Sequence, residues 1–150
     1  MKNQYRKKQQ QTASKSSRSN QHGIKNGYRS GLEDKIAKQI QDAGIELQYE
    51  TDKVNYLVPE RSAKYTPDFK LPKQGGFFYV ETKGIWNVAD RQKHLLIKQQ
   101  HPDIDIRFVF SNCRSKLYKG SKTTYAAYCE KHNFVYAHKT IPEEWLHEGN

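Results

Sequence analysis

The stretch FFYVET, residues 77–82, is the most strand-like segment of the chain, and Lys83 follows it directly. Consecutive aromatic and β-branched residues are typical of a buried strand. Side chains alternate between the faces of a strand, so Glu81 and Lys83 point one way and Thr82 the other. Before it, residues 72–76 (PKQGG) predict a turn, and residues 65–71 predict a strand interrupted by Pro67. Together they predict a β-hairpin that brings Asp68 and Glu81 to one end of a sheet.

Two carboxylates and a lysine in this arrangement match the needs of phosphodiester hydrolysis. Asp68, Glu81 and the carbonyl of Thr82 are hard oxygen ligands of the kind that Mg²⁺ and Mn²⁺ prefer. Lys83 can orient or help to deprotonate a water, or stabilise the charge that develops on phosphorus. This is the PD-(D/E)xK nuclease pattern. As a bare string it arises by chance, so its weight comes from the hairpin around it.

Ordinary structural roles compete with this interpretation. Glu81 and Lys83 could form an ion pair on an exposed sheet face, and Asp68 could cap a turn after Pro67. The first alternative is disfavoured because residues 77–80 are apolar, and a part-buried carboxylate needs a partner or a metal.

The remaining periodicity predicts helices and strands on both sides of the hairpin. A helix begins at Ser30 and ends at Gly44, and Ser30 with Glu33 forms a capping box that explains Glu33 without any catalytic role. This order of elements predicts an α/β or α+β fold with a mixed sheet and flanking helices. The other expected elements are an extended region at 45–58, a connection at 60–64, helices at 90–100 and 123–132, strands at 104–110 and 134–137, and a last turn from Pro142 that docks Trp145.

The positive charge is concentrated at the N-terminus. The chain has 150 residues and a formal charge of +10, from 26 basic and 16 acidic residues. Residues 1–30 hold 8 of the basic residues and no acidic one, so the rest carries a net charge of only +2. We expect residues 1–28 to be a disordered basic arm and residues 29–150 to be the catalytic domain. Such an arm suits a polyanion such as nucleic acid, although a solubilising tail has the same composition.

Several classes of protein are disfavoured by composition. No apolar run approaches the roughly 18 residues of a membrane span, and no apolar stretch follows the N-terminal charges, so we expect neither a membrane protein nor a secreted one. Cys113 and Cys129 are far apart and form no CxxC pair. This excludes a disulfide scaffold or a zinc ribbon and fits a reducing cytosol.

From Arg29 to Trp145 the sequence resembles the phage endonuclease I family, the Holliday-junction resolvases of the PD-(D/E)xK superfamily. The resemblance implies a restriction-endonuclease-like core and an intertwined homodimer that exchanges strands around residues 56–64. The matching stretches are RSGLEDK (29–35), YTPDF (65–69), VETKG (80–84), KHLLI (93–97), LYKGS (117–121) and IPEEW (141–145).

The same resemblance implies a composite catalytic site, with Glu33 from one chain and Asp68, Glu81 and Lys83 from the other. Glu33 would then cap its helix and still face the metal, so the expected metal ligands are Asp68, Glu81, Thr82 and Glu33. One position departs from the family, because Gln48 stands where members carry an acid. Glu50, two residues on, could face the same way on a strand.

The function that follows is a Mg²⁺-dependent endonuclease, with Mn²⁺ as a substitute, that resolves four-way junctions and other branched DNA without a small-molecule cofactor. It would be phage-encoded and act in the cytoplasm of the infected host.

The alternatives are a sequence-specific restriction-type nuclease and a catalytically dead DNA-binding module. The intact Asp68, Glu81 and Lys83 argue against the second. The candidate DNA contacts, each of which could instead be an ordinary solvated side chain, are Lys35, Lys38, Arg91, Lys93, His94, Arg114, Lys116 and Lys119.

Overall fold

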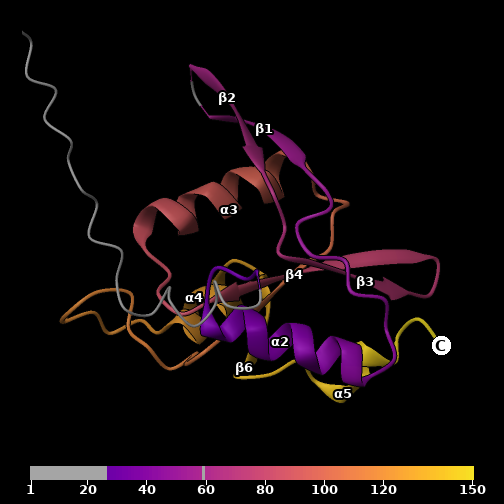
Figure 1. The fold of residues 1–150 in the computed structure, drawn as a ribbon. Coiled ribbons are helices and arrows are strands. Elements are labelled where there is room, and N and C mark those ends of the chain that lie inside the picture. Colours follow the sequence, from indigo (N-terminus) through magenta and orange to yellow (C-terminus); the bar gives the residue numbers. More distant parts are fainter. Residues whose placement is uncertain (1–26, 59) are drawn as a thin grey trace, which may run out of the picture.

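The predicted hairpin is present in the computed structural model, which describes residues 27–58 and 60–150 (Figure 1). It consists of β3 (Phe69–Lys73) and β4 (Gly76–Lys83), paired antiparallel. Pro72 lies inside β3, so the turn is shorter than expected and centres on residues 74–75. Gly75 has a φ of 79°, a left-handed conformation that glycine adopts without strain.

The hairpin forms one side of a four-stranded mixed sheet. β4 pairs in parallel with β5 (Ile106–Phe110), and β5 pairs in parallel with β6 (Val135–His138). The strand order is therefore β3-β4-β5-β6. The α+β prediction of a mixed sheet flanked by helices is confirmed.

Helices cover both faces of this sheet. One core cluster joins the inner face of α2 (Gly31–Asp42) and Leu146 of α5 (Glu143–Leu146) to Phe78 and Val80 of β4. The opposite face packs against α3 (Val88–Gln100) and α4 (Tyr125–Lys131), and Tyr79 clusters there with Ile97. Because side chains alternate along β4, the strand contributes to a separate hydrophobic core on each face of the sheet.

Trp86 fixes the chain just beyond β4. Its side chain is fully buried, with its ring centroid 5.0 Å from that of Phe108 and 5.1 Å from that of Phe110. Its backbone N–H donates to the hydroxyl of Tyr125, 3.1 Å away. The end of β4, which carries the acidic motif, is therefore anchored from its C-terminal side.

The capping prediction for α2 is confirmed with one difference. The hydroxyl of Ser30 accepts from the Glu33 N–H at 3.1 Å, as in a capping box. The carboxylate of Glu33, however, accepts from the backbone N–H of Arg29, one residue before the cap, also at 3.1 Å. Gly44 follows the helix with a φ of 74°.

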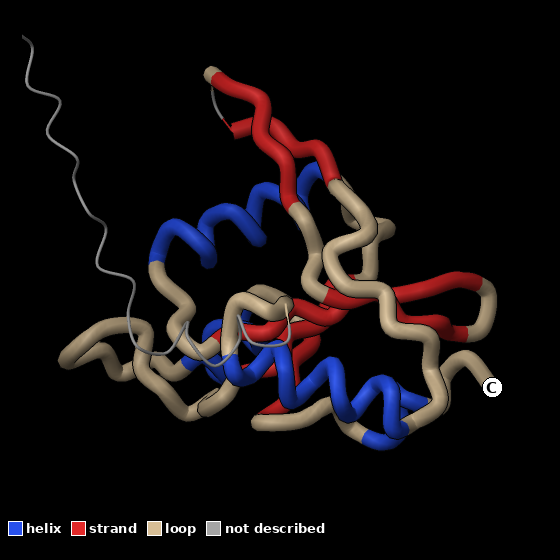
Figure 2. Tube along the Cα trace, viewed as in Figure 1, coloured by secondary structure: helices blue, strands red, loops and turns tan. Residues whose placement is uncertain are grey.

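Residues 60–64 are not the connection that the sequence predicts. β2 (Arg61–Tyr65) occupies them and pairs antiparallel with β1 (Val54–Val58), forming a second, two-stranded sheet. The polar sequence hides this strand because β2 is largely exposed and is held through main-chain pairing. Figure 2 shows this β1–β2 hairpin standing away from the rest of the molecule, beside α3. Glu60, at its tip, has a φ of 72°, which is strained for a residue with a side chain.

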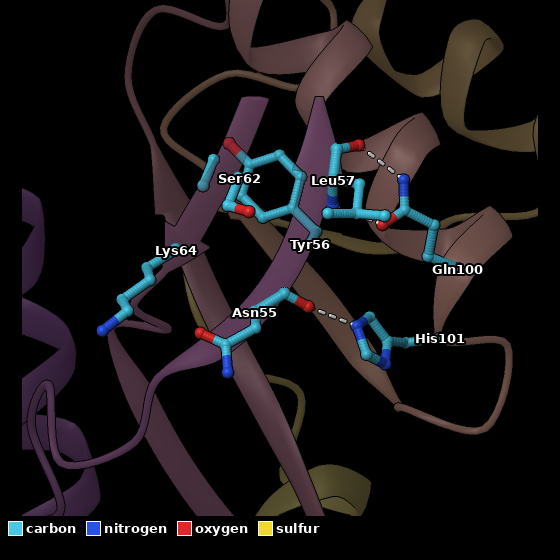
Figure 3. Close-up of a pocket in the computed structure, with 8 residues that line it drawn as sticks. Asn55, Tyr56, Leu57, Ser62, Lys64, Gln100 and His101 are labelled. Atoms are coloured by element: carbon cyan, nitrogen blue, oxygen red, sulfur yellow. Dashed lines mark hydrogen bonds between the residues drawn. The ribbon is translucent and has the colours of Figure 1, made fainter. Parts of the chain in front are cut away.

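Strand β1 of this projecting hairpin is fastened to the end of α3 (Figure 3). The side-chain amide of Gln100 accepts from the Leu57 N–H and donates to the Leu57 carbonyl, both at 2.6 Å. The imidazole of His101 contacts the carbonyl of Asn55. A hollow of about 800 Å³ lies here, lined by residues of the hairpin and the end of α3.

The later helices and strands agree with the sequence to within about two residues, and Trp145 packs edge-on against Phe78 as expected. Two expectations are wrong in extent: β3 begins at Phe69 rather than at residue 65, and only residues 54–58 of the extended region 45–58 form a strand. Cys113 and Cys129 are both free thiols. Within residues 27–58 and 60–150, no helix has the length and apolar character needed to span a bilayer. The predicted arm lies almost wholly outside the described residues; Tyr28, at its end, packs edge-on against Tyr49.

Candidate active site

Asp68 and Glu81 meet at the edge of the sheet where the parallel strands end. In the register of β3 and β4, Phe69 pairs with Val80, so one further step places Asp68 opposite Glu81. Both carboxylates are buried, with residue exposures of 2% and 5%. The carboxyl ends of parallel strands are the usual location of functional sites in sheets of this kind. The predicted pairing of the two acids is thus confirmed.

One oxygen of Asp68 accepts two hydrogen bonds from the neighbouring strand. Its Oδ2 accepts from both the backbone N–H and the hydroxyl of Thr82, each at 2.9 Å. Burial, followed by the carboxylates of Glu81 and Glu33, raises the pKa of Asp68 well above its usual range, and the Thr82 hydrogen bonds oppose this only in part. The ionised form is therefore costly unless a cation compensates it.

Glu81 is held by groups on both sides of its carboxylate. The hydroxyl of Tyr65 donates to Oε2 at 2.5 Å, and Lys83 Nζ lies 3.4 Å from Oε1. Burial raises the pKa of Glu81, while Lys83, Tyr65 and Lys93 counteract it in part. Tyr65 is a site residue that the sequence analysis missed, although it begins the YTPDF stretch.

Lys83 points to the same side of β4 as Glu81, as the alternation predicts. Its Nζ also lies 3.6 Å from the carboxylate of Asp90, near the start of α3. Burial lowers the pKa of Lys83, but the carboxylates of Glu81, Asp90 and Asp68 outweigh it, so the net shift is upward. The side chain is thus a positioned cation and hydrogen-bond donor.

Three further residues of the same chain lie at this edge of the sheet: Glu33, Arg29 and Glu50. Glu33 is buried and accepts from the hydroxyl of Tyr49 as well as from the Arg29 backbone. The guanidinium of Arg29 contacts Glu50 and lies 3.5 Å from Asp68 Oδ1. Glu50 is brought here by its N–H bond to the Asp68 carbonyl, at 2.9 Å, and by a φ of 51°. The sequence suggests that Glu50 could face this way through strand alternation from Gln48, but its backbone is left-handed rather than extended, and the sequence does not predict its contact with Arg29.

The donor chemistry suits a divalent cation, because carboxylate oxygens are the ligands that Mg²⁺ and Mn²⁺ take. Burial raises the pKa values of both acids, so their ionised forms gain from a nearby cation. The acids are nevertheless engaged with Thr82, Tyr65, Lys83 and Arg29. Within residues 27–58 and 60–150, no group of three His, Cys, Asp or Glu side chains is already arranged to hold a metal ion. Asp68 and Glu81 fit such an ion, and Arg29, which lies 3.5 Å from Asp68 Oδ1, would need to move for further ligands to close around it.

The candidate DNA contacts fall into two groups. Arg91 and His94 are buried: Arg91 Nη1 donates to the Trp86 carbonyl at 2.6 Å, and the His94 ring packs against Tyr65 and Phe108. Burial lowers the pKa of His94 well below its usual value, so it is neutral. Both serve the fold, and we leave them out of the proposed DNA surface. Lys93 is half-buried over the Tyr65 ring; the exposed candidates are Lys35, Lys38, Arg114, Lys116 and Lys119.

Replacing Asp68 by asparagine is expected to stabilise the protein in the absence of divalent metal. A raised pKa means that Asp68 stabilises the fold while it is protonated, and this contribution is lost as pH rises from about 4 through its pKa in the folded protein. The amide of the Asp68→Asn variant has no such loss, so the stability of the variant relative to the wild type should grow over that window. Each kcal/mol gained in the free energy of unfolding should raise the melting temperature by about 2–4 °C. Thermal melts in EDTA at a series of pH values measure it; equal pH dependence in both proteins would contradict the shift.

The hollow beside α3 does not contain this chemistry, since Asp68, Glu81 and Lys83 do not line it.

A mixed sheet that carries two buried acids and a lysine at the carboxyl ends of its strands defines a nuclease of the PD-(D/E)xK class. The sequence pattern of the phage endonuclease I family matches residues 13–150, so the chain belongs to that family.

Curated relatives agree with this assignment. Endonuclease I of Escherichia phage T7 is 56% identical over 121 residues, which is 81% of this chain and 79% of the relative. Endodeoxyribonuclease 1 of Enterobacteria phage T3 is 56% identical over 115 residues, which is 77% of this chain and 74% of the relative. The predictions of the family and of an endonuclease are confirmed.

Proposed function

We propose that this nuclease is a Mg²⁺-dependent deoxyribonuclease that cuts four-way junctions and other branched DNA as a homodimer, in the cytoplasm of a phage-infected host. The observation that carries the proposal is the buried Asp68–Glu81 pair beside Lys83, in a chain 56% identical to an endonuclease and an endodeoxyribonuclease of phages. DNA as the substrate follows the second of these names.

Asp68 and Glu81 would hold the ion, with Glu33 and the Thr82 carbonyl as further ligands. A bound divalent cation neutralises charge on the scissile phosphate and lowers the pKa of a water. Thr82 keeps Asp68 oriented through two hydrogen bonds, and Tyr65 keeps Glu81 oriented through one. These contacts hold the two acids in place before substrate arrives, which is the main requirement of a preorganised site.

Lys83 supplies the positive charge that belongs to the chain itself. Because its pKa is raised, it stays protonated at neutral pH, so its role is to orient a water and stabilise developing negative charge. Proton abstraction by Lys83 is disfavoured for the same reason. Of the two roles that the sequence left open, the surroundings of Lys83 favour the electrostatic one.

Strand exchange between two copies is supported by the projecting β1–β2 hairpin. Its strands are joined by a two-residue link, in which Glu60 has the strained φ of 72°. Opening the link would relieve that strain and let β1 pair with β2 of a partner through the same register. The exchange would convert contacts of one chain into contacts between chains. Each site would then combine Glu33 of one chain with Asp68, Glu81 and Lys83 of the other.

Mixing Glu33→Ala chains with Asp68→Ala chains tests the composite site. Each mixed dimer would contain one site with both acids intact, and random exchange makes about half of the dimers mixed. We expect nicking to recover to about a quarter of the wild-type rate, measured on a supercoiled plasmid after subunit exchange. Inactivity of the mixture, once heterodimers are shown by mass spectrometry, would refute the shared site.

The exposed basic side chains extend the site into a DNA surface. The segment with Arg114, Lys116 and Lys119 follows β5 at the same sheet edge, where the Ser111 N–H donates to the Lys83 carbonyl at 3.0 Å. Lys35 and Lys38 lie on α2, which begins beside Glu33, although Lys38 also pairs with Asp42 at 2.9 Å. Contacts of this type recognise phosphates and branch shape rather than base sequence.

One assay separates the proposed function from the alternatives. The protein is incubated with a four-way junction and with a linear duplex of the same sequence, in Mg²⁺ and then in EDTA. We expect cutting of the junction at least about tenfold faster than the duplex, in Mg²⁺ only. Equal cutting of both would reject junction selectivity, cutting of the duplex at one sequence would favour a restriction-type enzyme, and binding without any cutting would indicate a dead core.

A further inference from the structure

The guanidinium of Arg29 lies against the one oxygen of Asp68 that is still open. Oδ2 is taken by the N–H and hydroxyl of Thr82, whereas Oδ1 faces Arg29 Nη2 at 3.5 Å. The same Nη2 contacts the carboxylate of Glu50. The oxygen of Asp68 that could bind a cation is therefore the oxygen beside which Arg29 already places a positive charge.

Several groups hold Arg29 in this position. Its backbone N–H donates to Glu33, at 3.1 Å, just before the cap of α2. Burial lowers the pKa of its guanidinium, but Tyr49 and the carboxylates of Glu50, Glu33 and Asp68 together raise it. Arg29 thus carries its charge into a cluster of three acids and compensates part of their repulsion.

The hold on the side chain is nevertheless weak. The Arg29 side chain is 68% exposed, whereas the Asp68 side chain is 3% exposed. Ion pairs with one solvated partner contribute little free energy, so the guanidinium can leave while Asp68 stays fixed by Thr82. A small divalent ion that reaches the carboxylate would gain more from Asp68 than Arg29 does at 3.5 Å.

We propose that Arg29 is a resident counter-cation of the acidic site: held by Glu50, its guanidinium covers the open oxygen of Asp68, and a divalent ion binds only as Arg29 withdraws. The inference deepens the proposed function and rests on its metal site.

The test is a titration of the ¹⁵N-labelled full chain with Mg²⁺, without DNA, followed by NMR. The backbone N–H of Thr82 reports on Asp68, because it donates to that carboxylate. The Nε–Hε group of Arg29 reports on the guanidinium. We expect both signals to shift with one midpoint, and the Arg29 signal to move towards the position of a freely solvated arginine.

The outcomes separate the two proposals. If the Thr82 signal saturates with Mg²⁺ while the Arg29 signal keeps its position, the metal site stands and the displacement of Arg29 is wrong. If neither signal responds to Mg²⁺ at millimolar concentration, the proposed metal site fails and the inference fails with it.

A pair of variants distinguishes displacement from a general effect of charge. Arg29→Gln should lower the dissociation constant for Mg²⁺ about tenfold, as expected when a cation competing for a carboxylate is removed. Lys93→Gln is the matched control, because Lys93 acts on Glu81 through charge and lies over the Tyr65 ring rather than against Asp68. We expect a change of less than about threefold for it. Equal gains in calorimetric Mg²⁺ affinity for both variants would overturn the inference.

Discussion

The Asp68→Ala protein is expected to cleave a four-way junction about 10³-fold or more slowly than the wild type, with junction affinity changed by less than about threefold. Asp68 is the most deeply buried of the three site acids, and its side chain joins the start of β3 to β4. Alanine removes the proposed metal ligand but no positive charge from the DNA surface. Single-turnover cleavage rates and gel-shift titrations in Ca²⁺ measure the two effects separately.

Asp42→Ala is the matched control for this experiment. Asp42 is an exposed carboxylate at the end of α2 whose partner is Lys38, 2.9 Å away. Its loss should leave the cleavage rate within about twofold. An Asp68→Ala protein that is folded by circular dichroism and still cleaves at the wild-type rate would show that the metal site lies elsewhere.

Lys83→Met is expected to slow junction cleavage by about 10²–10³-fold, the usual effect of removing one group that stabilises developing charge. Methionine keeps the length and apolar part of the side chain, so the packing around it is preserved. The variant also deprives Glu81 of the neighbour that lowers its pKa most, so Glu81 should become harder to ionise. The loss should therefore be greatest at low pH and smaller, though still present, at high pH.

A pH series of single-turnover rates checks this expectation. Lys98→Met serves as the control, because Lys98 lies on α3, is exposed and donates to the Asn133 carbonyl at 3.0 Å, away from the acids. If Lys83→Met and Lys98→Met cleaved equally well, Lys83 would have no role in the chemistry. A defect of equal size at all pH values would separate Lys83 from the ionisation of Glu81.

The β3–β4 hairpin that carries the acids could be predicted because its signal is local. Strand alternation places Glu81 and Lys83 on one side, and a short turn places Asp68 opposite Glu81. Both relations depend on residues fewer than twenty positions apart. The capping box of α2 was predictable for the same reason, since Ser30 and Glu33 are three residues apart.

The surroundings of the acids depend on contacts that cross the fold. Tyr65 reaches Glu81 only because β2 leads into β3, and the polar sequence of β2 suggests a loop. Glu50 reaches Arg29 through a left-handed backbone conformation that no alternation predicts. Arg91 and His94 read as surface residues on a polar helix, but Trp86 and Phe108 provide a buried environment for them. Such long-range contacts leave no regular spacing in the sequence.

The amide of Gln100 has a consequence for how copies of this chain can associate. An unpaired strand edge is a template on which further strands can add without limit. At the outer edge of β1, the Gln100 side chain occupies both the N–H and the C=O of Leu57, and so takes the place of one residue of a neighbouring strand. Strand addition along this edge is therefore hindered at Leu57, which is compatible with the closed homodimer proposed above.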